Sequence, residues 1–383
     1  MQMLVPTEQG ALRQNNFDAI RLGMALLVVW SHSFALWRGS EATEWVSLAM
    51  GGVYNSGNLA VLTFFAISGF LITFSWLRAK SWLSYLARRL ARIHPGYLVA
   101  TAICSLAVVP AFSSRAFGQI SGPEIWGLVS NLWLRNFIIP SDAFNGLAVN
   151  GSLWSIPYEF LCYLGVMALG LFGLIRRRIV YPLAATALIA VRVWLDMTGR
   201  HPGGGMFAPI IGPAYLWFTV LPVFLLGGAV YLYRECIPRN RLFLVALIAC
   251  TVGAAHLPFT DPLRTVVTRT LMPAALVYAI FYMAFDRRIR AHDAARFGDF
   301  SYGTYLYAFP IQQMLVASLK GLIPFPVFIL LSLALSLAAG IASWYLVERW
   351  FLPRLRHGHH HTKDPHPLRE EARSSRPDHF PSA

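Results

Sequence analysis

Ten apolar runs, each about as long as a lipid bilayer is thick, dominate the 383-residue sequence. A membrane-spanning helix needs about 20 largely apolar residues, with a range of roughly 17–25. The runs lie at Ile20–Trp37, Asn58–Leu77, Pro95–Phe112, Leu153–Leu174, Ile179–Met197, Ala214–Tyr233, Leu242–Leu257, Thr265–Phe285, Tyr302–Leu319 and Phe325–Val347. We therefore predict an all-α fold, a polytopic membrane helical bundle of about ten transmembrane helices.

The charge distribution agrees with a membrane protein. Hydrophobic residues make up 56% of the chain and charged residues 13%, and the net charge is +14. A basic excess can indicate nucleic-acid binding, but here the Lys and Arg residues lie in the gaps between apolar runs. With the N-terminus inside, 23 of them fall in cytoplasmic segments and six in outer ones, as the positive-inside rule requires. We place both termini in the cytoplasm and expect a lipid bilayer, and no nucleic acid, as a partner.

The two ends of the chain suggest one large domain and a tail. The N-terminus has no basic region followed by a short apolar core and a cleavage site, so the first run is expected to stay as an anchor. We predict a transmembrane domain over residues 1–352 and a disordered cytoplasmic tail, rich in His, Pro and Arg, over 353–383. The tail's HGHHH run could bind a metal, but we expect a solvated segment and no metal site.

The first apolar run carries ionisable residues, which cost at least about 2.5–3.5 kcal/mol at the centre of a bilayer. Asp18 and Arg21 lie at its cytoplasmic end and His32 lies deep in it. Eleven residues separate Arg21 from His32, so the two lie within about 20° of one helix face and roughly 16 Å apart. One stripe thus presents a cation near the cytoplasm and an imidazole within the membrane. The alternative is an Asp18–Arg21 pair at a helix end, with His32 hydrogen-bonded inside the bundle.

A basic cluster formed by Arg88, Arg89 and Arg92 leads into the third run. Guanidinium groups near a helix N-terminus suit a phosphate or pyrophosphate, through paired hydrogen bonds and the helix dipole. The alternative is that these arginines only anchor the cytoplasmic end of the helix, as the positive-inside rule describes.

Glu159 enters the fourth run about one turn from its outer start. Its position relative to the preceding serines does not fit a capping box. The carboxylate therefore needs a histidine, a substrate hydroxyl or an arginine as its partner. Arg192 and Arg269, both inside apolar runs, are the arginine candidates.

Taken together, these segments resemble the acyltransferase-3 family of membrane O-acyltransferases. The matching motifs occur in family order from about residue 16 to 352: Phe17-Asp-Ala-Ile-Arg21 with His32, Phe64-Phe65-Ala-Ile-Ser68-Gly69-Phe70-Leu71-Ile72, Arg88-Arg89-Leu-Ala-Arg92-Ile-His-Pro95, Asn150-Gly-Ser-Leu-Trp-Ser-Ile-Pro-Tyr-Glu159, Ser301-Tyr-Gly-Thr-Tyr-Leu-Tyr and Val347-Glu348-Arg349. The family's ten-span core agrees with the independent count of apolar runs. Ala308 departs from the pattern, because members often carry a histidine there. Many members also append a soluble esterase-like domain, and we expect this chain to act without one.

The resemblance implies transfer of an acyl group, usually acetyl, from cytoplasmic acyl-CoA to a hydroxyl of a cell-surface glycan or lipid-linked oligosaccharide. The expected location is the bacterial inner membrane, and acyl-CoA is the donor co-substrate. The implied catalytic residues are His32, as general base or acyl carrier, and Glu159, which would orient His32 or the acceptor. The implied donor-binding residues are Arg21, Arg88, Arg89 and Arg92. The implied substrate-binding residues are Asp18, Ser68, Trp154 and Tyr305.

Three alternatives stay open at this stage. A secondary transporter could use the buried Arg, His and Glu residues as a substrate or proton path, although the sequence shows no inverted repeat. A structural partner in glycan assembly would need no catalytic histidine. An acyl carrier at Cys104 or Cys162 is disfavoured, because no base neighbours either cysteine in the sequence.

Overall fold

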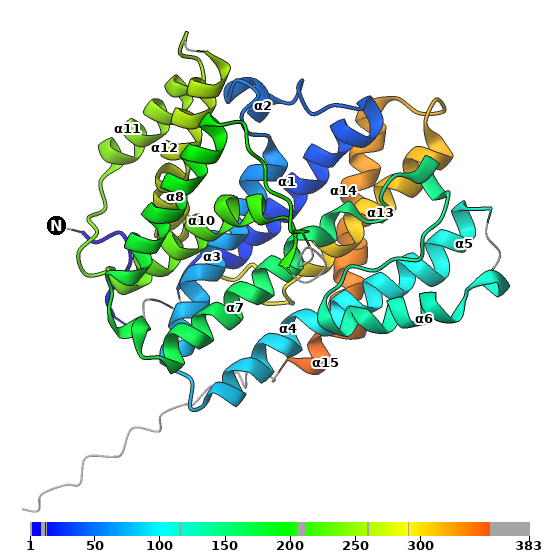
Figure 1. The fold of residues 1–383 in the computed structure, drawn as a ribbon, viewed down its shortest axis with the longest axis horizontal. Coiled ribbons are helices and arrows are strands. Elements are labelled where there is room, and N and C mark those ends of the chain that lie inside the picture. The colour runs from blue at the N-terminus through cyan, green and yellow to red at the C-terminus, as the bar shows by residue number, and fades with distance from the viewer. Residues whose placement is uncertain are drawn as a thin grey trace, which may run out of the picture. The chain divides into compact units, whose positions relative to one another are not determined.

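The computed structural model in Figure 1 describes residues 2–8, 12, 14–114, 117–205, 211–258, 260–289 and 291–352. These residues form helices joined by turns and loops, without a strand beyond two isolated bridges. Helices occupy all ten predicted runs: α1 (Phe17–Arg38), α3 (Ser56–Leu77), α4 (Trp82–Ile103), α7 (Ser155–Leu171), α8 (Val180–Met197), α10 (Ala214–Leu232), α11 (Arg241–Ala254), α12 (Asp261–Ala284), α13 (Ser301–Leu319) and α14 (Phe325–Ser343). The all-α prediction is confirmed. The predicted tail and its HGHHH run lie outside the described residues.

Eight described helices are long and apolar enough to cross a bilayer. One of them runs from α4 through a π-helical turn, Cys104–Val108, into α5 (Val109–Phe112). The two remaining predicted spans are α11, which has 14 residues, and α13, which is long enough but less apolar. The chain is therefore an integral membrane protein, while the total of ten spans and the cytoplasmic termini stay predictions. Shorter helices α2 (Trp45–Ala49), α6 (Gly122–Val129) and α15 (Arg349–Phe351) flank the long ones.

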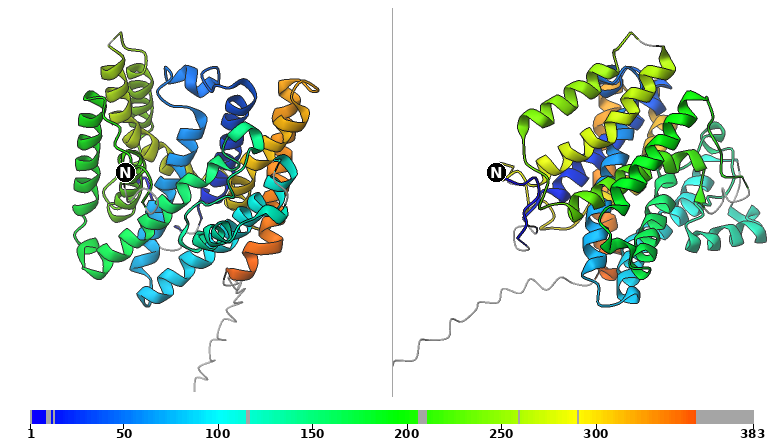
Figure 2. Two further views of the ribbon diagram at one scale, coloured as in Figure 1. Left: turned by 45° about the vertical axis from the view of Figure 1, so that its right-hand side comes forward. Right: turned by 60° about the vertical axis from the view of Figure 1, so that its left-hand side comes forward.

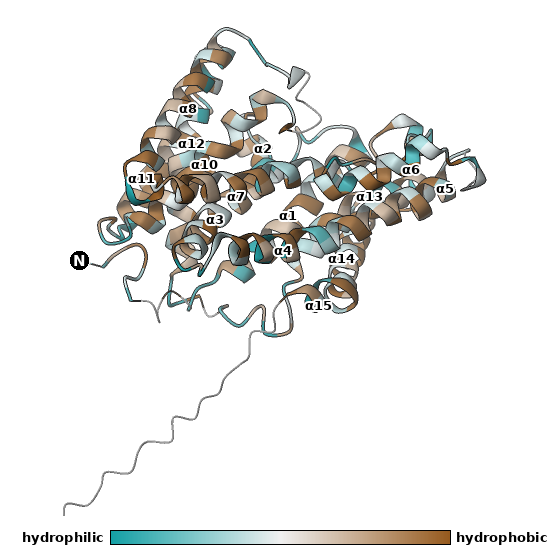
Figure 3. Ribbon diagram, turned by 60° about the horizontal axis from the view of Figure 1, so that its bottom comes forward, coloured by the Kyte–Doolittle hydropathy of each residue, from teal (hydrophilic) through white to brown (hydrophobic). Residues whose placement is uncertain are grey.

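The helices α1 and α3 pack against each other and connect the two sides of the bundle (Figures 1 and 2). On one side, α10 packs against α3 and α8, and α12 contacts both α8 and α11. On the other side, α13 packs against α1 and is covered by α14. The helices α4 and α7 contact each other and α3. Figure 3 shows hydrophobic residues along most of the helices, with hydrophilic residues concentrated in loops and at helix ends.

The packing of α3 against α10 depends on glycine. A Cβ atom at Gly69 would lie 1.9 Å from the Phe224 carbonyl oxygen, and one at Gly227 would lie 2.0 Å from the Ala66 oxygen. Helices in a membrane associate mainly through van der Waals contact, which small residues permit by letting the backbones approach. This close approach fixes the position of α3, which carries Ser68.

We predict that Gly69→Ala lowers the stability of the protein by about 1–3 kcal/mol, because the added methyl group overlaps the α10 backbone. Gly165→Ala is the matched control, since a Cβ there meets nothing within 4 Å. Thermal unfolding of both variants in detergent measures the difference. Equal melting temperatures for the two variants would contradict the proposed close packing.

Candidate active site

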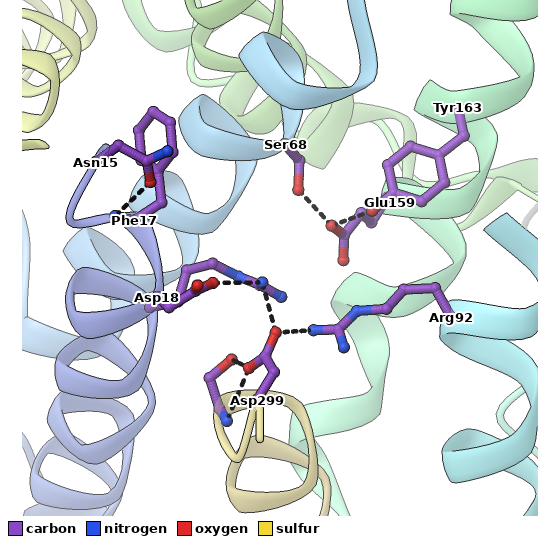
Figure 4. Close-up of polar contacts among 10 residues, drawn as sticks. Asn15, Phe17, Asp18, Ser68, Arg92, Glu159, Tyr163 and Asp299 are labelled. Atoms are coloured by element: carbon purple, nitrogen blue, oxygen red, sulfur yellow. Dashed lines mark hydrogen bonds and ion pairs between the residues drawn. The ribbon is translucent and has the colours of Figure 1, made fainter. Parts of the chain in front are cut away.

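Glu159 lies near the start of α7 and faces α3. A short 3₁₀ turn, Gly151–Trp154, leads into α7, and the Asn150 side chain caps this turn by accepting from the Ser152 amide. The Glu159 Oε1 atom accepts hydrogen bonds from Ser68 Oγ at 2.5 Å and from Tyr163 OH at 2.6 Å. Figure 4 shows the three side chains converging. The carboxylate is thus held by two hydroxyl groups from α3 and α7.

The arginine candidates for Glu159 have another partner. Arg192 and Arg269 pair with Asp196 at 3.7 and 3.1 Å, and Arg269 also donates to Tyr215 OH. These contacts join the C-terminal end of α8 to α12. Neither arginine therefore accounts for the position of Glu159.

An ion-pair cluster links α1, α4 and the residue two positions before α13. The Asp299 Oδ2 atom accepts from Arg21 Nη1 at 2.7 Å and from Arg92 Nη2 at 2.6 Å. Its Oδ1 atom accepts from the amide and hydroxyl of Ser301, at 3.2 and 2.5 Å, at the first turn of α13. Asp18 lies farther from Arg21, at 3.8 Å. Burial alone would raise the pKa of Asp299, but the two guanidiniums and the Ser301 hydrogen bonds hold it well below its usual range.

One cavity is lined both by Glu159 and by Arg21 of the ion-pair cluster. It contains about 40 Å³ of free space, which is room for a few water molecules. Its walls come from α1, α3, α7 and α13, and the polar lining residues are Arg21, Ser68, Ser155, Glu159, Ser301, Tyr302 and Tyr305. A guanidinium and a carboxylate therefore face one small space inside an apolar bundle.

Of the two aromatic residues predicted to bind substrate, Tyr305 lines this cavity and Trp154 does not. Tyr305 lines it, shares a hydrogen bond of 2.7 Å with Ser155 Oγ and donates to the Ser152 carbonyl at 2.7 Å. Trp154 is not part of its lining, and its ring packs against Tyr158.

His32 lies beyond the end of the cavity. Its ring makes an edge contact with Phe309 of α13, with 5.1 Å between ring centroids, and Phe309 lies one turn beyond Tyr305. The buried Nδ1 atom has no hydrogen-bond partner among the described residues. The neighbouring Ser31 lies level with Gly57, whose added Cβ would be 3.1 Å from Ser31 Oγ. Val61, one turn along α3 from Gly57, lines the cavity. The ring is thus about one helical turn from the cavity's end.

The three arginines of the basic cluster have different environments. Arg92 belongs to the ion-pair cluster with Asp299. Arg89 donates to Ser75 Oγ at 3.4 Å and lies over the rings of Tyr85 and Tyr163. Arg88 is half-buried and has no ion-pair partner among the described residues.

Sequence reasoning missed Asp299 and Tyr163 as members of this site. Asp299 stands in a loop with several arginines, and the only sequence signal is an acidic residue directly before the Ser301 motif. Tyr163 is one turn from Glu159 on the same helix, so helical spacing alone could have found it.

Comparison with known proteins gives the chemical class. The family model described as an acyltransferase domain, acyltransferase 3, matches residues 14–345. An O-acetyl transferase of Shigella phage Sf6 is 28% identical over 353 residues, which cover 89% of this chain and 97% of the relative. Acyltransferase MdmB of Streptomyces mycarofaciens is 26% identical, over 70% of this chain and 72% of the relative. Nodulation protein 10 of Rhizobium leguminosarum bv. viciae is 24% identical, over 81% and 86%. No solved structure matches the chain.

The helical bundle and its buried charged cavity define an integral membrane protein with a polar interior site. The chain belongs to the acyltransferase-3 family, and it is a membrane O-acyltransferase. The family match therefore favours an enzyme over the secondary transporter that the buried charges alone left open.

We predict that Asp299→Asn lowers the free energy of unfolding by about 3 kcal/mol or more, because Arg21 and Arg92 would keep buried, uncompensated charges. Asp261→Asn is the control. Its carboxylate pairs with Arg264 but is 85% exposed, and such surface pairs contribute about 1 kcal/mol or less. Thermal unfolding in detergent at pH 7 compares the variants. A loss no larger than that of the control would contradict a structural role for the ion-pair cluster.

The same ion pairs predict a pH dependence. Because the folded-state pKa of Asp299 is depressed, its contribution is present at neutral pH and declines as the pH falls below about 3.9, the usual Asp value. The stability difference between wild type and Asp299→Asn should therefore shrink at low pH. A stability difference that stays constant down to the lowest pH at which the wild type is folded would count against this assignment.

Proposed function

We propose that the protein transfers an acyl group, most simply acetyl, from cytoplasmic acyl-CoA to a hydroxyl of a cell-surface glycan or its lipid-linked precursor. We place it in the bacterial inner membrane. The observation that carries the proposal is the cavity in which Glu159 and Arg21 face each other, in a chain that belongs to an acyltransferase family. The relative named O-acetyl transferase, which this chain matches over nearly its whole length, supports acetyl as the group transferred.

The donor would enter from the side that carries the basic residues. Acyl-CoA is a charged nucleotide that does not cross lipid, so only its pantetheine arm and acyl group need to enter the bundle. Arg21 and Arg92 already bind the Asp299 carboxylate. We therefore assign the pyrophosphate to Arg88 and Arg89, of which Arg88 has no ion-pair partner among the described residues.

In the proposed reaction, His32 acts as the general base. The acceptor hydroxyl gives its proton to a neutral imidazole while its oxygen attacks the thioester carbonyl, and the CoA sulfur leaves and takes up a proton. A neutral imidazole is a common general base for removing the proton of a hydroxyl group. An acyl-imidazole formed on His32 is the alternative route. The partner-free Nδ1 atom supports either role.

Glu159 would act through the cavity. Its Oε1 atom is occupied by Ser68 and Tyr163, and no hydrogen bond to its Oε2 atom is found within the described residues. We propose that Oε2 accepts a hydrogen bond from the acceptor hydroxyl or from an amide of the pantetheine arm. Glu159 then orients a substrate rather than His32 itself.

The direct test is glycan O-acylation in cells with and without this gene, measured by mass spectrometry. Ester groups that disappear with the gene and return with the wild-type copy support the proposal. Unchanged acylation of every surface glycan and lipid-linked precursor in the two strains would overturn it.

We predict that His32→Ala lowers acyl transfer by about 10²–10⁴-fold, the usual contribution of a general base. The control is His292→Ala, since His292 is exposed and its one ion pair within the described part of the chain is with Asp293. Transfer from radiolabelled acetyl-CoA is measured with equal amounts of membrane-inserted protein. Full activity of the His32 variant at normal expression would remove the imidazole from the mechanism.

We predict that Arg88→Gln raises the KM for acetyl-CoA about tenfold with little change in kcat, because a charge-assisted hydrogen bond to phosphate is lost. Arg287→Gln removes an exposed arginine from the loop after α12 and is the control. Steady-state kinetics over a range of donor concentrations gives both constants. An unchanged KM would place the pyrophosphate elsewhere.

A further inference from the structure

A second cavity is lined by residues at the end of α3, the start of α4 and the end of α7. It has a volume of about 310 Å³, at the lower end of the range of roughly 300–1,000 Å³ for small-molecule sites. Trp76, Trp82 and Arg176 contribute to its walls. A Cβ atom at Gly170 would lie 1.9 Å from the Trp76 ring. Only glycine at this position lets the ring lie directly against α7.

The second cavity connects with the basic cluster along one face of α4. Trp82, Tyr85, Arg89 and Arg92 follow each other at spacings of three or four residues, which places them on one side of the helix. The Tyr85 ring contacts Trp76, and Arg89 lies over Tyr85 and donates to Ser75. From Arg89 to Trp82 is seven residues, or about 10 Å along the axis.

The surroundings of the second cavity are aromatic and cationic. The segments Trp76–Trp82 and Gly170–Arg178 contain Arg78, Lys80, Arg176, Arg177 and Arg178 and no acidic residue. Trp82 lines the second cavity and is 46% exposed. A flat, uncharged ring attached to phosphate groups matches this combination, because bases stack on aromatic side chains and phosphates pair with guanidiniums.

We infer that the second cavity binds the adenine end of the acyl-CoA donor, with the base stacked on Trp82 and a phosphate near Arg176. This inference rests on the proposed function.

The length of the donor supports it. The pantetheine arm is about as long as four to five extended residues, or roughly 16 Å, and Arg21 and His32 are separated by a similar rise of about 16 Å along α1. A thioester at His32 therefore leaves the far end of the pantetheine arm level with Arg21, which Asp299 joins to Arg92. Arg88 and Arg89 lie one turn from Arg92 on α4, and Trp82 lies about 10 Å farther along that helix than Arg89.

The test compares two donors that differ only in the nucleotide, acetyl-CoA and acetyl-pantetheine. Trp82→Ala should raise the KM for acetyl-CoA about tenfold, a change within the range that stacking on one base contributes. It should leave kcat, and the KM for acetyl-pantetheine, unchanged. Trp82→Phe should restore the affinity for acetyl-CoA. Trp350→Ala is the control, because Trp350 is also exposed and lies outside the second cavity.

The outcomes separate this inference from the proposed function. Trp82→Ala with an unchanged KM for acetyl-CoA, or with equal losses for both donors, overturns the adenine site and identifies Trp82 as a structural or membrane-interface residue. Equal KM values of the wild type for the two donors also overturn it. In all these cases acyl transfer itself stands. A wild-type protein that uses neither donor overturns the proposed donor, and the adenine site with it.

Discussion

The ion-pair cluster of Arg21, Arg92 and Asp299 is the interaction on which the arrangement of the site depends. It joins α1 and α4 at the start of α13, three segments that are far apart in the sequence. Charges buried in an apolar bundle are tolerated only when they are paired and hydrogen-bonded. Asp299 satisfies this condition with two guanidiniums and the first turn of α13. The start of α13, and with it Tyr302 and Tyr305, is thereby held against α1.

The two carboxylates of the site differ in a way that suggests different tasks. Asp299 is neutralised by direct contact with two cations, so it has little charge left for a ligand. Glu159 is held by the hydroxyls of Ser68 and Tyr163 and has no ion pair among the described residues. Its charge is therefore directed into the cavity that Arg21 also lines. An arginine held in an ion pair and a carboxylate held only by hydroxyl groups thus line the same small space.

Much of the fold could be predicted from the sequence, because span length and apolarity are local properties. For example, Asn58–Leu77 was predicted and α3 covers Ser56–Leu77, its start set by a capping box between Asn55 and Asn58. The partners of individual charges could not be predicted, since they depend on which helices meet. Arg269 illustrates this point, because only the packing of α8 against α12 shows that it pairs with Asp196.

The cavity ends about one helical turn short of His32. This gap affects how a substrate would reach the imidazole. Phe309 contacts the imidazole and follows the cavity-lining Tyr305 by one turn along α13, so its ring lies beside His32 at this end of the site. Gly151 also lies against Phe309, where an added Cβ would be 2.8 Å from the ring. The ring therefore contacts both His32 and a glycine that belongs to the turn preceding α7. Because that turn also positions Glu159, a shift of α7 that makes room for substrate would move both the carboxylate and the support of Phe309. This mechanical link would couple filling of the cavity to access to His32.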